Sequence, residues 1–242
     1  MAKKKTRTYP TESFKRCHCE PAYVDDDPTQ IDKNTRPLEA LTEAQGHYIL
    51  SLKSNAITFA LGPAGTGKTF VAGVFAIDEL LAKRIERIII TRPKTTVDED
   101  WGEMPGTLIE KYAPYLGPFW HVFNKRLGKS HLENLMKPGR ERIQALPLGF
   151  MRGETFENAI VILDEAQNTT PEQMKMFLTR LGRGARLIID GDESQKDIQG
   201  PSGLTDAVGR IRHLKSVGVV KFEKSDIVRH DLVQDIIEAY QR

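Results

Sequence analysis

The chain has 242 residues, of which 39% are hydrophobic and 28% are charged, enough for one sizeable domain with a buried core. Its formal net charge of +2 is too close to zero to indicate nucleic-acid binding, because such binding depends on local clusters of basic residues. Two cysteines are too few for a disulfide framework, and no apolar run approaches the ~20 residues of a membrane span, so we expect a cytoplasmic protein without a membrane partner.

Residues 1 to 40 are polar and lack an apolar period, which predicts an N-terminal arm ahead of the folded domain. The arm contains Cys17, His18 and Cys19, three side chains that can bind a metal ion. Zinc motifs need a second pair of ligands, which the triplet lacks, so a solvated tail is the simpler interpretation.

From residue 41 to residue 242, strand-like and helix-like segments alternate, which predicts an α/β domain with a mostly parallel sheet and helices on both faces. Thr42 followed by Gln45 is typical of a capping box at the start of a helix. The predicted strands are residues 57–61, 87–91, 159–163, 186–190 and 217–222, and further helices are predicted at residues 70–83, 171–181 and 231–240.

Residues 93 to 156 interrupt this alternation and are predicted to form a helical insertion rich in aromatic and basic side chains. Aromatic rings beside Lys and Arg suit the stacking of unpaired bases and contacts with phosphates. The alternative is a buried helix face, because four of the aromatics are spaced three to four residues apart. The aromatic residues are Trp101, Tyr112, Tyr115, Phe119, Trp120 and Phe123.

Directly after the first predicted strand, the chain matches the phosphate-binding loop pattern G-x-x-x-x-G-K-[ST]. Glycines in such a loop let successive backbone N–H groups point at phosphate oxygens, and the N-terminus of the following helix adds partial positive charge. We expect Lys68 to neutralise the β and γ phosphates of a nucleotide and the Thr69 hydroxyl to ligate Mg²⁺. The loop consists of Gly62, Pro63, Ala64, Gly65, Thr66, Gly67, Lys68 and Thr69.

Two acids, Asp164 and Glu165, follow the apolar strand predicted at residues 159–163, at the sheet edge where open α/β folds bind ligands. We expect Asp164 to hold Mg²⁺, directly or through water, and Glu165 to act as general base toward the attacking water. Gln195 follows another predicted strand, and its neutral amide can hydrogen-bond the γ phosphate, although a plain surface turn is the alternative for that segment. The loop and the acids together favour hydrolysis over simple nucleotide binding.

Over about residues 41–242, the sequence resembles the PhoH-like ATPases, with the motor core of superfamily 1 helicases as wider kin. The resemblance rests on many motifs in a fixed order. They are Leu41-Thr42-Glu43-Ala44-Gln45, the phosphate-binding loop, Thr91-Arg92-Pro93, Asp164-Glu165-Ala166-Gln167-Asn168-Thr169-Thr170, Gln173-Met174-Lys175-Met176, Thr179-Arg180-Leu181-Gly182, Gly191-Asp192 with Gln195, Ser202-Gly203-Leu204 and Ser225-Asp226-Ile227-Val228-Arg229-His230.

This resemblance implies a RecA-like P-loop NTPase fold, ATP as the nucleotide, and Gln45 as the residue that reads adenine. It also implies that Arg229, and with it Arg180, approaches the γ phosphate. Residues 98–106 depart from the family's usual pattern in their middle, which leaves open what that loop contacts.

A helicase motor normally has two RecA-like domains with the nucleotide between them, whereas this chain is predicted to have one. We therefore expect a ring-like homo-oligomer, a hexamer, in which Arg229 or Arg180 of one subunit completes the nucleotide site of the next. For Arg229, an ordinary surface ion pair with Asp226 or Asp231 is the alternative.

Three functions stay open at the level of sequence. The first is an ATP-driven motor that acts on RNA or single-stranded DNA, and the second is an ATP-dependent switch that acts on a protein partner. The third is a small-molecule kinase, which the presence of Glu165 beside Asp164 disfavours.

Overall fold

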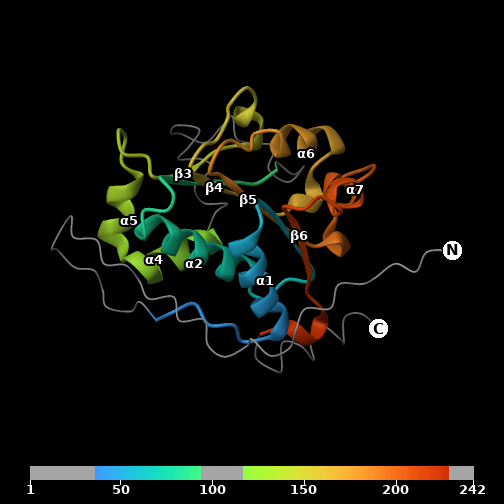
Figure 1. Ribbon diagram of the computed structural model, residues 1–242, viewed down its shortest axis with the longest axis horizontal. Helices are drawn as coiled ribbons and strands as arrows, with labels where there is room; N and C mark the ends of the chain where they lie inside the picture. The colour runs from blue at the N-terminus through green and yellow to red at the C-terminus, as the bar shows by residue number, and fades with distance from the viewer. Residues whose placement is uncertain (1–35, 94–116, 229–242) are drawn as a thin grey trace.

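The structure is a computed structural model that describes residues 36–93 and 117–228. Within these residues, six parallel strands form one sheet in the order β3-β2-β4-β5-β1-β6 (Figure 1). Because the strands are parallel, their carboxyl ends meet at one edge of the sheet. The strands are β1 (Ile57–Leu61), β2 (Arg87–Thr91), β3 (Ile143–Ala145), β4 (Ala159–Leu163), β5 (Arg186–Gly191) and β6 (Val217–Lys221).

Helices cover both faces of the sheet (Figure 1). The first face carries α1 (Glu43–Ser54), α2 (Lys68–Leu81), α4 (Gly117–Leu127) and α5 (Lys129–Met136), and the second carries α6 (Pro171–Leu178) and α7 (Gly203–Ile211). Four short 3₁₀ helices complete the described elements: η4 (Leu148–Met151), η5 (Ala166–Asn168), η6 (Glu193–Gln195) and η7 (Lys224–Asp226).

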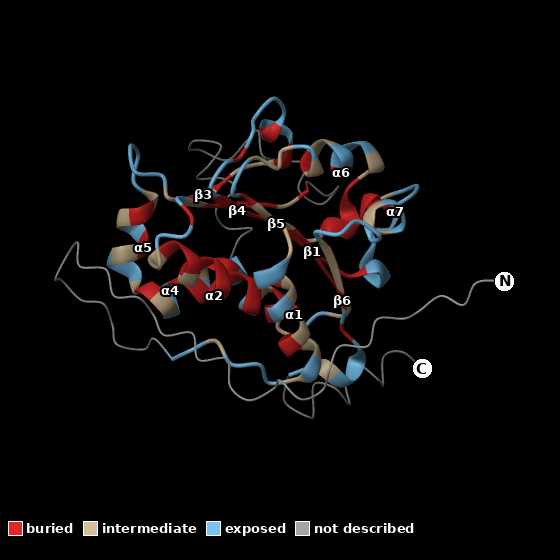
Figure 2. Ribbon diagram, viewed as in Figure 1, coloured by how far each residue is buried: buried red, intermediate tan, exposed pale blue. Residues whose placement is uncertain are grey.

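The sheet is buried from both sides, as Figure 2 shows for its central strands. In β2, Ile88 and Ile90 contribute to the core beneath α2, while Ile89 contributes to the core beneath α6 and α7. This alternation follows from the two-residue period of a strand, and burial on both faces explains why the strands are continuously apolar. The order and direction of the strands confirm the predicted RecA-like α/β fold.

All five predicted strands form, and the helices predicted at residues 70–83 and 171–181 correspond to α2 and α6. Thr42 caps α1 by accepting a hydrogen bond from the Gln45 backbone N–H at 3.2 Å. The reciprocal bond of a capping box is replaced, because the Gln45 side chain accepts from the Leu41 N–H instead. The predicted helix at residues 231–240, the first 35 residues of the arm predicted at residues 1–40, and the loop at residues 98–106 lie outside the described residues.

The insertion predicted as helical contains α4 and α5, but it also contributes β3 to the edge of the sheet, where β3 pairs with β2. Three residues are too few to show a strand period, so the sequence did not indicate β3. Phe119 and Phe123 of α4 are fully buried, which confirms the alternative of a buried helix face for these two rings. Trp120 is half-buried, and the other aromatics of the insertion lie outside the described residues.

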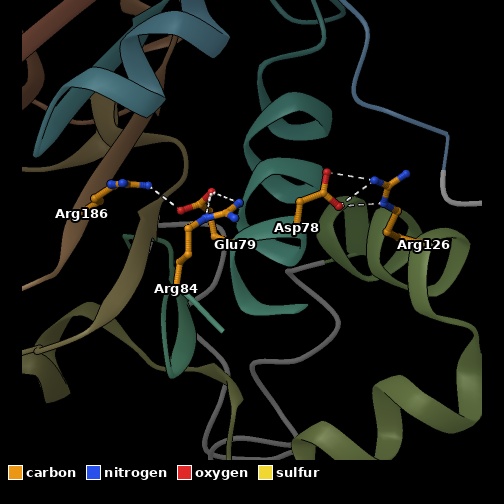
Figure 3. Close-up of polar contacts among 5 residues, drawn as sticks. All are labelled: Asp78, Glu79, Arg84, Arg126 and Arg186. Carbon is orange, nitrogen blue, oxygen red and sulfur yellow. Dashed lines mark hydrogen bonds and ion pairs between the residues drawn. The ribbon is translucent and has the colours of Figure 1, made fainter. Parts of the chain in front are cut away.

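Helix α4 is fixed on α2 by close packing and by an ion pair. A side chain at Gly73 of α2 would meet Val122 of α4, so the two helices approach closely there. Five residues after Gly73, Asp78 of α2 accepts hydrogen bonds from the guanidinium of Arg126 in α4, whose Nη2 lies 2.7 Å from Oδ1 and 2.9 Å from Oδ2 (Figure 3). Helix α4 is therefore closely attached to the helix that follows the phosphate-binding loop.

Next to this pair, Glu79 forms two ion pairs near the end of α2, one of them with the sheet (Figure 3). Its carboxylate accepts from Arg84 at 2.6 Å and from Arg186, at the start of β5, at 2.8 Å. Burial alone would raise the pKa of Glu79, but the two arginines lower it, so the carboxylate stays ionised.

Within the parts of the chain that the structure describes, no helix is both long enough and apolar enough to cross a bilayer.

Candidate nucleotide-binding site

The phosphate-binding loop connects β1 to α2 at the carboxyl edge of the sheet. Gly62, Gly65 and Gly67 have φ angles of 143°, 87° and 84°, which residues with a Cβ rarely adopt. Lys68 is the first residue of α2, so the orphan N–H groups of the helix start open toward the inside of the loop. The loop therefore has the backbone shape that the motif predicts for holding phosphates.

Lys68 is only 8% exposed, and its Nζ donates to the carbonyl oxygens of Gly62 at 2.7 Å and Pro63 at 2.8 Å. Burial lowers the pKa of Lys68, while the nearby carboxylates of Asp190 and Asp192 raise it. The ammonium group is thus held at the loop, where an incoming triphosphate can replace weak carbonyl partners with charged oxygens.

Gln45 hydrogen-bonds the backbone of the phosphate-binding loop. Its side-chain amide donates to the Thr66 carbonyl oxygen at 3.0 Å, and its amide oxygen accepts from Leu41. Gln45 is 4% exposed and does not line the cleft that lies between the loop and the acids after β4. The structure therefore places Gln45 as a support of the loop, and its contact with adenine stays a prediction.

Asp164 and Glu165 follow β4 beside the loop. Asp164 is buried, and burial together with the Glu165 carboxylate raises the pKa of Asp164 to about 6. Glu165 has a left-handed backbone, with φ of 52° and ψ of 40°, and its carboxylate Oε1 lies 3.2 Å from Nη2 of Arg92.

Gln167 links the two acids to the segment after β5, a role that the sequence motif did not reveal. Its amide nitrogen donates to Glu165 Oε2 at 2.6 Å, and its amide oxygen accepts from the Asp192 N–H at 3.0 Å. Asp192 in turn accepts from the Gln195 side chain at 2.9 Å. One amide therefore couples the end of β4 to the segment that carries Gln195.

Asp190, the second-to-last residue of β5, is buried close enough to Asp164 for the two carboxylates to interact. Its Oδ1 accepts from the Tyr48 hydroxyl at 2.8 Å, while its Oδ2 has no partner among the described residues. Burial and the charge of Asp164 raise the pKa of Asp190 to about 7. No sequence signal pairs Tyr48 with Asp190, because 142 residues separate them.

A cleft of about 590 Å³ brings most of the predicted site residues together. Lys68, Thr69, Asp164, Glu165 and Gln195 all line it, so Gln195 belongs to the cleft as well as to a surface turn. The remaining lining residues are Ala64, Gly65, Gly67, Phe70, Pro118, His121, Val122, Gly191 and Asp192. Gly62, Pro63 and Thr66 shape the loop without lining the cleft.

The cleft fits a magnesium ion bound together with a triphosphate. Mg²⁺ prefers oxygen ligands and usually takes one or two from the protein, with phosphates and water completing its octahedron. The Asp164 carboxylate and the Thr69 hydroxyl line the same cleft as Lys68 and are the residues that would hold it.

Of the two predicted arginines, the structure describes only Arg180, and Arg180 does not line this cleft. Arg180 follows α6, and its guanidinium donates to the carbonyl oxygens of Met176 and Glu154. Arg180 lies near the start of β4, because the adjacent Leu181 bridges Phe156, so it sits at the opposite edge of the sheet from the loop. Arg229 lies outside the described residues, which end at Val228.

Two solved structures have a distantly similar arrangement. The N-terminal domain of the DNA packaging ATPase from bacteriophage phi29 aligns with a TM-score of 0.43 and 15% identity, covering 70% of this chain and 91% of that chain. Pif1 helicase from Candida albicans aligns with a TM-score of 0.41 and 17% identity, covering 83% of this chain and 43% of that chain. Because both likenesses are distant, the fold assignment rests on the strand order and the loop.

Sequence relatives are much closer. Protein PhoH of Escherichia coli (strain K12) is 45% identical over 210 residues, which are 86% of this chain and 59% of that protein. A PhoH-like protein of Bacillus subtilis (strain 168) is 45% identical over 217 residues, which are 88% of this chain and 67% of that protein. The family model described as PhoH-like protein matches residues 37–241. Together with the loop and the two acids in one cleft, these matches show that the chain is a P-loop NTPase that belongs to the PhoH-like protein family.

Proposed function

We propose that this chain binds ATP with Mg²⁺ and hydrolyses it. The observation that carries the proposal is the meeting of Lys68, Thr69, Asp164 and Glu165 in one cleft at the carboxyl edge of the sheet. Phosphoryl transfer needs mainly positioning and charge stabilisation, and these four side chains supply a cation, two metal ligands and a base.

In this proposal each group has a separate role. Backbone N–H groups of the loop and the Lys68 ammonium bind the β and γ phosphates, and the Glu165 carboxylate accepts a proton from the attacking water. When bound, Mg²⁺ neutralises charge on the phosphate oxygens. Gln195 lines the same cleft, where its amide can hydrogen-bond the γ phosphate, and the Gln167 amide donates to both the Gln195 carbonyl oxygen and Glu165.

We further propose that hydrolysis is coupled to RNA or single-stranded DNA. Support comes from a groove of about 330 Å³ between α4 and α5, lined by the half-buried Trp120, by Lys129 and Lys137, and by Glu133, which pairs with Lys129 at 3.9 Å. An aromatic ring beside basic side chains suits base stacking and phosphate contact. The groove is adjacent to the nucleotide cleft, because Val122 and His121 on the same helix line the cleft.

An ATP-dependent switch that acts on a protein partner is the second candidate, favoured by Phe150, an aromatic side chain that is 64% exposed on η4. A small-molecule kinase is the third candidate and is disfavoured. A kinase binds an acceptor molecule in place of the attacking water, whereas Glu165 lines the cleft beside Asp164, where it suits the activation of water.

ATP turnover measured with and without single-stranded RNA or DNA tests the coupling. We expect stimulation that falls steeply as salt rises, because phosphate contacts release counterions. Trp120→Ala should weaken oligonucleotide binding by about 1–3 kcal/mol, while Trp120→Phe retains most of it. Turnover that is unaffected by oligonucleotide but dependent on a protein partner would favour the switch.

A further inference from the structure

Arg92 is the first residue after β2, and it faces the acids that follow β4. The two strands pair in parallel register, with Thr91 opposite Leu163, so the residues after them emerge side by side. There the Arg92 Nη2 lies 3.2 Å from Glu165 Oε1, and the two side chains are 30% and 32% exposed. The pair is sheltered enough for the charge interaction to matter.

The backbone of Glu165 needs such support. A left-handed conformation is unfavourable for a residue with a Cβ and persists when surrounding contacts determine it. Gln167 holds Oε2 at 2.6 Å while Arg92 holds Oε1, so both carboxylate oxygens are engaged from opposite sides. Each oxygen has about two lone-pair sites, which leaves capacity to accept a proton from water.

We propose that Arg92 is a positioning residue for hydrolysis, which fixes the Glu165 carboxylate in the direction that a general base requires. Arg92 does not line the cleft, so it acts through Glu165 and does not touch the nucleotide. The inference rests on the proposed ATP hydrolysis and adds a residue that the loop and the two acids do not include.

A double-mutant cycle tests it at saturating Mg²⁺, with kcat, KM and the Kd of a non-hydrolysable ATP analogue measured for Arg92→Ala, Glu165→Gln and the double variant. We expect Glu165→Gln to lower kcat by on the order of 10²–10⁴ and Arg92→Ala to lower it by about tenfold or more. Because Arg92 acts through Glu165, the double variant should stay within about twofold of Glu165→Gln, and the Kd should stay within about threefold in all variants.

Arg92→Lys should restore part of kcat relative to Arg92→Ala, since lysine keeps the positive charge but lacks the planar guanidinium. Arg210→Ala, which breaks the exposed pair with Asp206 on α7, is the matched control and should leave kcat unchanged. Effects of Arg92→Ala and Glu165→Gln that multiply, or an unchanged or raised kcat in Arg92→Ala, would overturn the inference. Absence of turnover in the wild type would instead overturn the proposed function.

Discussion

At the scale of single residues, the site depends on acids with different degrees of burial. Asp190 is 1% exposed and has a partner for only one of its oxygens, whereas Glu165 is held by two side chains at the cleft. The sequence predicted Glu165 and Asp164 because both follow an apolar strand within one short motif. It could not predict the partnership of Asp190 with Tyr48, which depends on the tertiary packing of α1 against the sheet.

Replacing Asp190 by asparagine should change how stability depends on pH. The pKa of Asp190 is raised from 3.8 to about 7, so the folded protein disfavours the ionised form, and this residue lowers stability progressively as pH rises from about 4 to about 7. Asp190→Asn removes that loss and can still accept from the Tyr48 hydroxyl. Relative to wild type, the variant should gain on the order of 1–4 kcal/mol between pH 4 and pH 8.

Urea unfolding of both proteins across this pH range measures the difference. Asp206→Asn is the control, because Asp206 lies at the surface and its pKa is lowered by Arg210, so it should show no such gain. A stability difference between Asp190→Asn and wild type that does not vary with pH would contradict the account.

At the scale of elements, strands with strong apolar runs could be predicted from sequence, and β3 and α7 could not. Residues 143–145 are a strand because β2 offers an open edge beside them, which is a tertiary cause. Helix α7 contains Gly203 and Gly209, which weaken its helical signal, and its start is fixed by Ser202, whose hydroxyl accepts from the Leu204 N–H.

The attachment of α4 to α2 should depend on the Asp78–Arg126 pair. Arg126→Met keeps the aliphatic stem but leaves Asp78 without its partner, and burial already raises the pKa of Asp78. The free energy of unfolding should fall by roughly 1–3 kcal/mol, less than the 3–5 of a fully buried pair because Asp78 is 25% exposed.

Chemical denaturation of wild type, of Arg126→Met and of the double variant Asp78→Leu/Arg126→Met measures these free energies of unfolding. The double variant should recover most of the loss, since it removes the unpaired carboxylate as well. A double variant that is less stable than Arg126→Met would show that the pair matters for another reason.

At the scale of the whole molecule, no arginine among the described residues lines the nucleotide cleft, and Arg92 next to it is paired with Glu165. Arg180 lies at the far edge of the sheet and cannot reach the cleft of its own subunit. A ring-like homo-oligomer, proposed as a hexamer, would let Arg180 or Arg229 of one subunit serve the next.

Mixing two inactive variants tests this assembly. Lys68→Ala lacks the phosphate-binding lysine but retains the arginines, while Arg229→Ala retains the loop. If the arginine acts between subunits, the mixture should hydrolyse ATP faster than the sum of the separate variants, because an arginine at the transition state contributes roughly 10³–10⁵ in rate. A mixture no more active than its parts would argue for a site completed within one subunit, and the same test applies to Arg180→Ala.

The central claim is that one cleft both binds and hydrolyses ATP, and the most direct test is Mg²⁺-dependent ATP turnover measured beside ATP binding for wild type, Lys68→Ala and Glu165→Gln. Wild type should bind and turn over ATP, Lys68→Ala should lose both, and Glu165→Gln should bind ATP normally while its turnover falls by on the order of 10²–10⁴. Turnover that persists in Lys68→Ala or in Glu165→Gln would contradict the assignment of this cleft.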